Sequence, residues 1–170
     1  MRYIILSITL LIIANINLHS QEMKTYIDRT YNFSIQYPDT WGELDNPSTV
    51  CLFIRPLEKE GQLFRENINL IIDKTKGFEL KEYVGATKMQ FRAQLKDYNH
   101  VSTDYIKFSD IEFGQVIYQH NLSNLSLQGV YYVCIIKGKA YNFTCSTTQQ
   151  NFKKYYPLFE EIIKSFSLND

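Results

Sequence analysis

The chain has 170 residues, of which 45% are hydrophobic and 15% aromatic, and its 18 basic residues balance its 18 acidic ones. This composition is typical of one folded domain and excludes an intrinsically disordered chain. Because there is no net charge to attract a polyanion, we expect no nucleic acid partner, and an anionic membrane surface is disfavoured for the same reason. The 13 Tyr and 11 Phe residues supply enough apolar volume for a core without a metal or disulfide framework.

The N-terminal segment has the pattern of a signal peptide. Arg2 is followed by a mostly apolar run that ends at Ala14. This run is shorter than the roughly 20 apolar residues that a membrane-spanning helix needs. We therefore predict a signal peptide over residues 1–20, cleaved before Gln21, and a single exported domain over residues 21–170 with no membrane span left after cleavage. An uncleaved anchor is the alternative. The expected location is periplasmic or extracellular.

The first part of the exported segment shows the alternation of β-strands. Apolar and polar residues alternate over residues 31–37, which predicts a strand with one buried face, and Pro38 then begins a turn. A short apolar strand is expected at residues 50–54, and an alternating one at residues 67–72. Between these two strands, residues 55–65 form a charged segment that we expect to be a long loop.

The period of the apolar residues then changes to three or four, at Leu80, Val84, Thr87, Phe91 and Leu95. This spacing predicts an amphipathic helix over residues 80–95. Further β segments are expected at residues 101–108, 111–120 and 127–137. Residues 140–147 complete a hairpin with the last of these, through a two-residue loop that contains Gly138.

A second amphipathic helix ends the chain. Because proline is unfavourable inside a helix, we expect a turn over residues 149–156 and a main helix that begins near Pro157. The order strands, helix, strands, helix predicts an α+β domain, in which two main helices pack on a mostly antiparallel sheet of about six to seven strands. Apolar residues on both faces of the last hairpin indicate that both faces of this sheet are at least partly covered.

The three cysteines are expected to be small buried hydrophobes. The hairpin register places Cys145 opposite Val130 or Tyr132, so that Cys134 lies further along the neighbouring strand. The two Cα atoms are then further apart than the roughly 7 Å that a disulfide allows.

The common catalytic and cofactor motifs, such as GxGxxG, GxxxxGK[ST], HExxH, GxSxG and CxxC, do not occur in this sequence. Beyond residue 20 there are two histidines, His100 and His120, which are too few for a His-rich site, so we expect no metal and no cofactor. Cys51 with either histidine as its base is the one arrangement for nucleophilic catalysis. Its apolar surroundings would make the thiol unreactive, and we expect a protein that is not an enzyme.

Three segments resemble the PsbP-like superfamily. Residues 31–41, Tyr-Asn-Phe-Ser-Ile-Gln-Tyr-Pro-Asp-Thr-Trp, are similar to the family's opening hairpin, and residues 66–72, Glu-Asn-Ile-Asn-Leu-Ile-Ile, resemble its second signature strand. Residues 141–166 are similar to its final strand and terminal helix. The resemblance implies an α/β/α sandwich and a non-photosynthetic, exported member of a superfamily that includes PsbP, DcrB and a Ran-binding import factor. None of these is a clear enzyme.

The first hypothesis for function is therefore a non-enzymatic binding or accessory protein of the bacterial cell envelope that contacts another protein. Long loops carry function more often than they carry packing, so the expected partner-binding site is the loop over residues 55–65, with a plain solvated loop as the alternative. Its charged residues are Arg55, Glu58, Lys59, Glu60 and Arg65. A second hypothesis is a small-molecule or lipid binder, with an apolar pocket between the helix over residues 80–95 and the sheet.

Overall fold

The computed structural model describes residues 21–169, so the predicted signal peptide lies outside the described residues. Within this part of the chain, no helix is long and apolar enough to cross a membrane. The elements are β1 (Met23–Asp28), β2 (Phe33–Pro38), β3 (Gly42–Glu43), β4 (Cys51–Ile54), β5 (Asn67–Lys74), α1 (Leu80–Gln94), β6 (Asn99–Phe108), β7 (Ile111–Leu122), β8 (Leu125–Ile136), β9 (Lys139–Thr148), a short 3₁₀ turn (Gln149–Asn151), α2 (Phe152–Lys164) and β10 (Ser167–Leu168).

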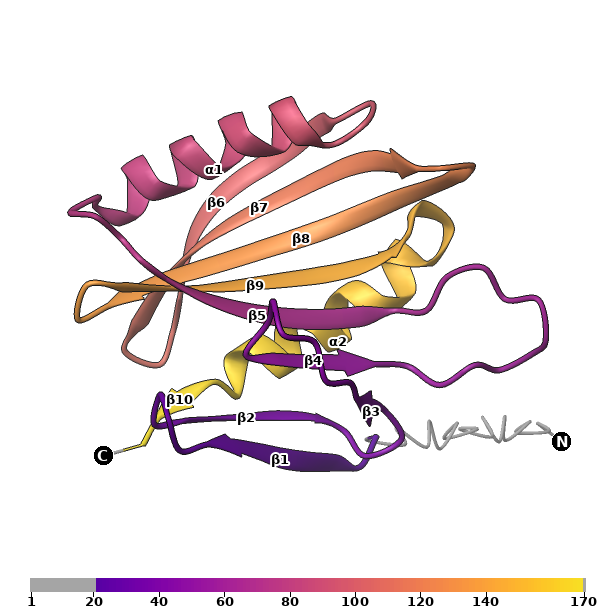
Figure 1. Ribbon diagram of the computed structural model, residues 1–170, viewed down its shortest axis with the longest axis horizontal. Coiled ribbons are helices and arrows are strands. Elements are labelled where there is room, and N and C mark those ends of the chain that lie inside the picture. Colours follow the sequence, from indigo (N-terminus) through magenta and orange to yellow (C-terminus); the bar gives the residue numbers. More distant parts are fainter. Residues whose placement is uncertain (1–20, 170) are drawn as a thin grey trace, which may run out of the picture.

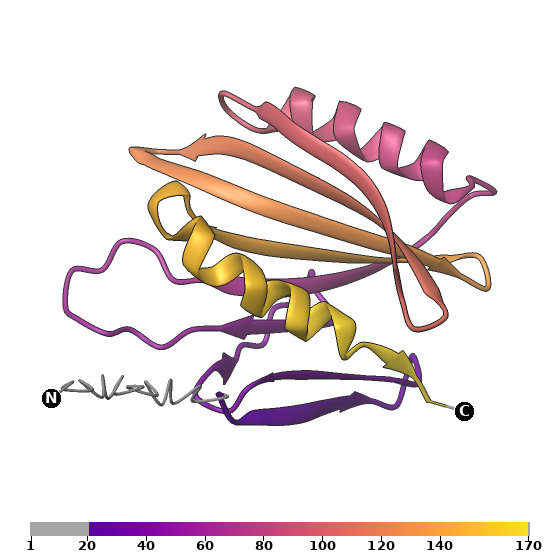
Figure 2. The same ribbon diagram turned by 180° about the vertical axis from the view of Figure 1, so that it is seen from behind.

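The strands form two antiparallel sheets. The large sheet has seven strands in the order β3-β4-β5-β9-β8-β7-β6, and the small one has three in the order β1-β2-β10. Helix α1 packs on one face of the large sheet, and α2 and the small sheet lie together on the other (Figures 1 and 2). The predicted α+β sandwich with two main helices is thereby confirmed.

The main core lies between the large sheet, α2 and the small sheet. Every second residue of each strand points into this core, and many of these residues are aromatic. Tyr37 of β2 stacks on Phe53 of β4, with ring centroids 4.0 Å apart, and Phe166 packs edge-on against Phe143 at 5.1 Å. The largest fully buried side chains are Tyr37, Tyr132, Phe33, Phe53, Phe113, Phe143, Phe159, Ile35, Ile68, Leu70, Ile162 and Ile163.

A second, smaller core lies under α1. Val84 is the buried residue of this helix, and it faces Val116, Tyr131 and Val133 of the sheet. The helix comes very close to the sheet at Gly114 of β7, where a Cβ atom would lie 2.4 Å from Val84 Cγ2. Glycine at this position therefore allows the close packing of α1 on β7.

The last hairpin turns at Lys137 and Gly138, whose φ angles are +50° and +74°. These angles are typical of the two-residue turn that matches the twist of a hairpin. The resulting register places Cys145 opposite Val130 and Cys134 opposite Tyr141. All three cysteines are free and buried, as predicted.

Two features of the fold differ from the sequence prediction. The short strands β1, β3 and β10 were not predicted, and β1 and β10 form the small sheet with β2. Helix α2 begins at Phe152, so the prediction that it begins near Pro157 is wrong. Pro157 is exposed and removes one backbone donor from the helix, while Tyr155 and Phe159 on either side of it are buried in the core. This burial holds the first turns in helical form.

Candidate functional site

The loop that connects β4 to β5, residues 55–66, projects beyond the ends of the strands (Figure 1). Its two ends are joined by the backbone, because the Arg55 N–H donates to the Glu66 carbonyl over 2.9 Å. The Asn67 side chain also donates to the Arg65 carbonyl over 2.9 Å. The loop therefore leaves the sheet from a closed base.

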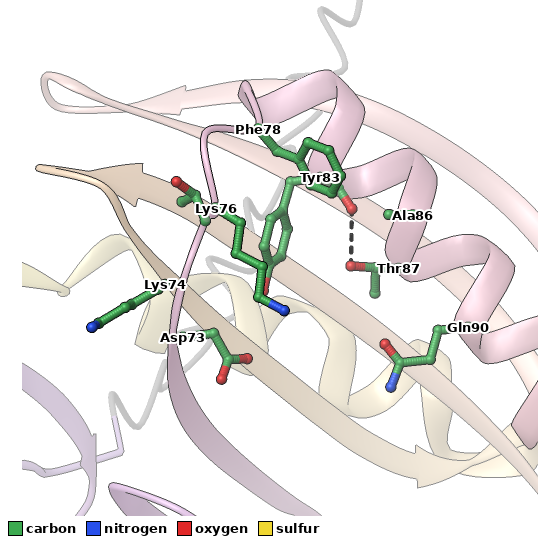
Figure 3. Close-up of a pocket in the computed structure, with 9 residues that line it drawn as sticks. Asp73, Lys74, Lys76, Phe78, Tyr83, Ala86, Thr87 and Gln90 are labelled. Carbon is green, nitrogen blue, oxygen red and sulfur yellow. Dashed lines mark hydrogen bonds between the residues drawn. The ribbon is translucent and has the colours of Figure 1, made fainter.

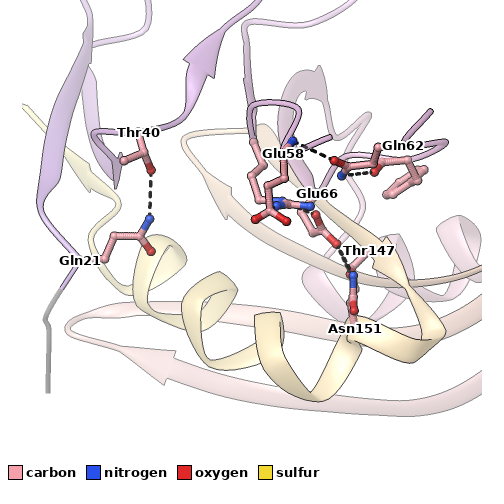
Figure 4. Close-up of polar contacts among 9 residues, drawn as sticks. Gln21, Thr40, Glu58, Gln62, Glu66, Thr147 and Asn151 are labelled. Carbon is pink, nitrogen blue, oxygen red and sulfur yellow. Dashed lines mark hydrogen bonds and ion pairs between the residues drawn. The ribbon is translucent and has the colours of Figure 1, made fainter. Parts of the chain in front are cut away.

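An ion pair lies buried at this base. Arg55 Nε donates to Glu66 Oε2 over 2.6 Å, and the two residues are 8% and 1% exposed. Glu66 Oε1 accepts hydrogen bonds from Thr147 Oγ1 at 3.2 Å and from Asn151 Nδ2 at 3.0 Å (Figure 4). The Arg55 guanidinium also lies 5.6 Å from the centre of the Tyr155 ring. These contacts fix the loop to β9 and to the start of α2.

The Glu66 carboxylate is charged in this setting. Burial alone would raise its pKa, but the hydrogen bonds from Asn151 and Arg55 and the charge of Arg55 lower the pKa below its ordinary value of 4.5. Glu58 forms a second ion pair with Arg55. Of the five charged residues expected to contact a partner, Arg55 is thus buried and supports the loop, and Glu58 is partly engaged with it.

The outer part of the loop is ordered by Gln62. Its Oε1 accepts the Glu58 N–H at 3.0 Å, and its Nε2 donates to the Phe64 carbonyl at 2.7 Å (Figure 4). Lys59 and Glu60 are exposed beside this bridge, and Arg65 is half-buried.

Two leucines of the loop are also exposed. Leu57 is 61% exposed and Leu63 is 79% exposed. Neither leucine is among the five charged residues expected to contact a partner, although an apolar residue inside a polar loop is a sequence signal for such a contact. The loop therefore presents both apolar and charged side chains on an ordered backbone.

The expected pocket between α1 and the sheet takes a different form. The centre of that interface is closed by the contact of Val84 with Gly114. A groove of about 330 Å³ lies instead along the edge of α1, against the end of β5 (Figure 3). Its lining is polar and apolar in nearly equal parts, with Asp73, Lys74, Thr75, Lys76, Phe78, Tyr83, Ala86, Thr87 and Gln90.

Within residues 21–169, the structure does not bring Cys51 together with His100 or His120. Cys51 belongs to the core on the α2 side of the large sheet, where burial first, and then the charges of nearby carboxylates, raise its pKa to about 12. His100 on β6 lies opposite Tyr118 on β7, and the His120 ring stacks on the ring of the same Tyr118. Tyr118 faces α1, on the opposite side of the sheet from Cys51. Between residues 21 and 169, no three His, Cys, Asp or Glu side chains are grouped to hold a metal ion.

Comparisons with known proteins agree with this architecture. The family model described as PsbP matches residues 21–168. The solution structure of cyanobacterial PsbP (CyanoP) from Synechocystis sp. PCC 6803 is 17% identical, with a TM-score of 0.65 over 89% of this chain and 95% of that chain. No curated protein matches the chain.

Two further solved structures have the same fold. LpqN of Mycobacterium tuberculosis, described as involved in cell envelope biogenesis, is 10% identical, with a TM-score of 0.66 over 89% of this chain and 88% of that chain. PA94 of Pseudomonas aeruginosa, a protein of unknown function, is 15% identical, with a TM-score of 0.61 over 87% of this chain and 98% of that chain. At these low identities the structural likeness shows the fold alone.

Proposed function

This chain belongs to the PsbP family, and we propose that it is a non-catalytic, exported protein of the bacterial cell envelope that binds another protein through the loop over residues 55–66. The signal-like pattern of residues 1–20 supports export. The shared fold with LpqN, whose description connects it with cell envelope biogenesis, supports a role in the envelope.

The observation that carries this proposal is the exposure of Leu57 and Leu63 on a loop with a fixed base. Burying apolar surface is the main favourable contribution to protein association, at about 25 cal/mol per Å². A loop that is already ordered loses less conformational entropy on binding than a flexible one does. Lys59 and Glu60 beside the leucines would orient a partner of complementary charge.

The test is a pull-down from an envelope extract of the source organism. The bait is the wild-type protein or the double variant Leu57→Ser, Leu63→Ser, which removes apolar contacts without touching the Arg55–Glu66 pair. Met89→Ser is the matched control, because Met89 is 75% exposed and lies on α1, away from the loop. We expect the wild type and the control to recover the same protein and the double variant to lose it. Equal recovery by all three baits would overturn the loop assignment.

A further inference from the structure

The groove beside α1 has one wall formed by a fixed turn. Thr75, at the start of this turn, is buried; its N–H donates to the Gly138 carbonyl at 3.0 Å, and its own carbonyl accepts the Phe78 N–H at 3.1 Å. Lys76 follows with a φ of +54°, a conformation that is uncommon for a residue other than glycine. The Lys76 side chain consequently lies over the groove, alongside the ring of Tyr83 (Figure 3).

Beneath the groove, a chain of polar groups connects its two walls. The hydroxyls of Thr87 on α1 and Tyr131 on β8 are 3.5 Å apart, and the Tyr131 hydroxyl donates to Asn142 Oδ1. Asn142 Nδ2 donates in turn to Asp73 Oδ2, 3.3 Å away on β5. Tyr131 and Asn142 are buried and need such partners, and their hydrogen bonds hold the exposed Asp73 carboxylate in place in the lining of the groove.

Asp73 and Lys76 face the groove with opposite charges, whereas the side chain of Lys74, the third charged residue of its lining, points away from the groove (Figure 3). The ion pairs formed within residues 21–169 involve neither Asp73 nor Lys76. An apolar ligand would bury both charges without supplying a counter-charge to either. A ligand with a single charge would satisfy one of them and be repelled by the other, whereas a zwitterion satisfies both.

The same groove offers apolar contact. Phe78 lies at one end of the groove and is 47% exposed, and the small side chain of Ala86 leaves space beside the Tyr83 ring. The volume of about 330 Å³ falls in the range of small-molecule sites, at its lower end. We propose that this groove binds a small zwitterion with an apolar side chain, namely an amino acid or short peptide with free amino and carboxylate groups, through Asp73 and Lys76 respectively.

The test is a titration of the ¹⁵N-labelled protein with a dipeptide of two phenylalanines, followed by NMR. We expect saturable shifts at the amides of Thr75, Ala86 and Gln90, with a Kd of about 1 mM. Acetylating the amino group or amidating the carboxylate should each weaken binding about tenfold, because each removes one charged contact. No saturable shift up to about ten times that Kd would overturn the proposal, as would equal shifts with a neutral disaccharide.

Two variants connect each charge with its partner. Asp73→Asn should lower the affinity for the free dipeptide about tenfold and leave the affinity for the acetylated dipeptide unchanged. Lys76→Gln should likewise lower the affinity for the free dipeptide about tenfold and leave the affinity for the amidated dipeptide unchanged. The matched controls are Asp110→Asn in the β6–β7 turn and Lys107→Gln near the end of β6. If the variants weaken every form of the ligand equally, the assignment of charges is wrong. The double leucine variant of the loop should bind the dipeptide like the wild type, so the two proposals can fail independently.

Discussion

Arg55 and Glu66 close the base of the β4–β5 loop twice, once through their backbones over 2.9 Å and once through their side chains over 2.6 Å. Because Glu66 also accepts hydrogen bonds from Thr147 and Asn151, the same carboxylate holds β9 and the start of α2. The loop and the core are therefore mechanically connected at Glu66.

Replacing Glu66 with Gln should destabilise the protein by about 3 kcal/mol, because it leaves the buried Arg55 charge with only the exposed Glu58 carboxylate as its counter-charge. The measurement is the free energy of unfolding from urea denaturation. Lys164→Gln is the control. It removes the ion pair between Lys164 and Glu160, in which the Lys164 side chain is 52% exposed. The expected loss of unfolding free energy is less than about 1 kcal/mol. Equal costs for the two variants would show that the Arg55–Glu66 pair contributes no more than a surface pair.

The lowered pKa of Glu66 also predicts how stability depends on pH. The unfolded chain takes up a proton near the ordinary pKa of 4.5, whereas the folded chain does so only at lower pH. The contribution of this group is therefore present above about pH 4.5 and is lost as the pH falls through the lower pKa of the folded state. Urea denaturation from pH 7 to pH 3 should show the wild type approaching Glu66→Gln below pH 4.5. A constant difference between them would contradict this assignment.

The elements whose apolar residues recur with a clear period could be predicted from the sequence. The presence of the two helices, a hairpin turn that contains Gly138 and most strands of the large sheet follow from apolar spacing and turn chemistry. The strands β1, β3 and β10 did not follow, because β3 and β10 have two residues each and β1 has little alternation of burial. Their strand conformation depends on pairing with distant partners, which local sequence does not report.

The candidate sites were predictable only in outline. The sequence indicated a long charged loop, but the burial of Arg55 depends on Glu66, Thr147 and Asn151, which lie on three different elements. Similarly, the floor of the groove joins Asp73, Tyr131 and Asn142, and only the sheet register brings these residues together. Local sequence patterns do not show which polar groups from distant segments hydrogen bond with one another.

Adding a methyl group at Gly114 should force α1 away from the sheet. A Cβ there would lie 2.4 Å from Val84 Cγ2, so Gly114→Ala should cost about 1–3 kcal/mol of unfolding free energy. The added change Val84→Ala should cost less in this background than in the wild type, because it makes room for the methyl group. Gly85→Ala is the control, since nothing lies within 4 Å of its added Cβ and alanine favours the helix. Strict additivity of the Gly114 and Val84 changes would refute the clash.

The thiols should be unreactive in the folded protein. Burial raises the pKa of Cys51 and of Cys134 to about 12, and that of Cys145 well above its ordinary value. Because the thiolate is the reacting species, iodoacetamide at pH 8 should label none of them until urea unfolds the chain. Mass spectrometry counts the labels at each urea concentration. Labelling of Cys51 well below the unfolding transition would show that its strand opens locally or that its thiol is activated.

Pro157 should be a position where one substitution stabilises the protein. It is the sixth residue of α2 and is exposed, so alanine would restore a backbone donor for the Lys153 carbonyl without loss of packing. The expected gain in unfolding free energy is about 1–2 kcal/mol, because the restored helix bond is partly offset by the greater freedom of the unfolded chain. Pro56→Ala, in the loop and outside any helix, has only the second effect and should destabilise slightly. If Pro157→Ala behaves like Pro56→Ala in urea denaturation, the proline imposes no strain on α2.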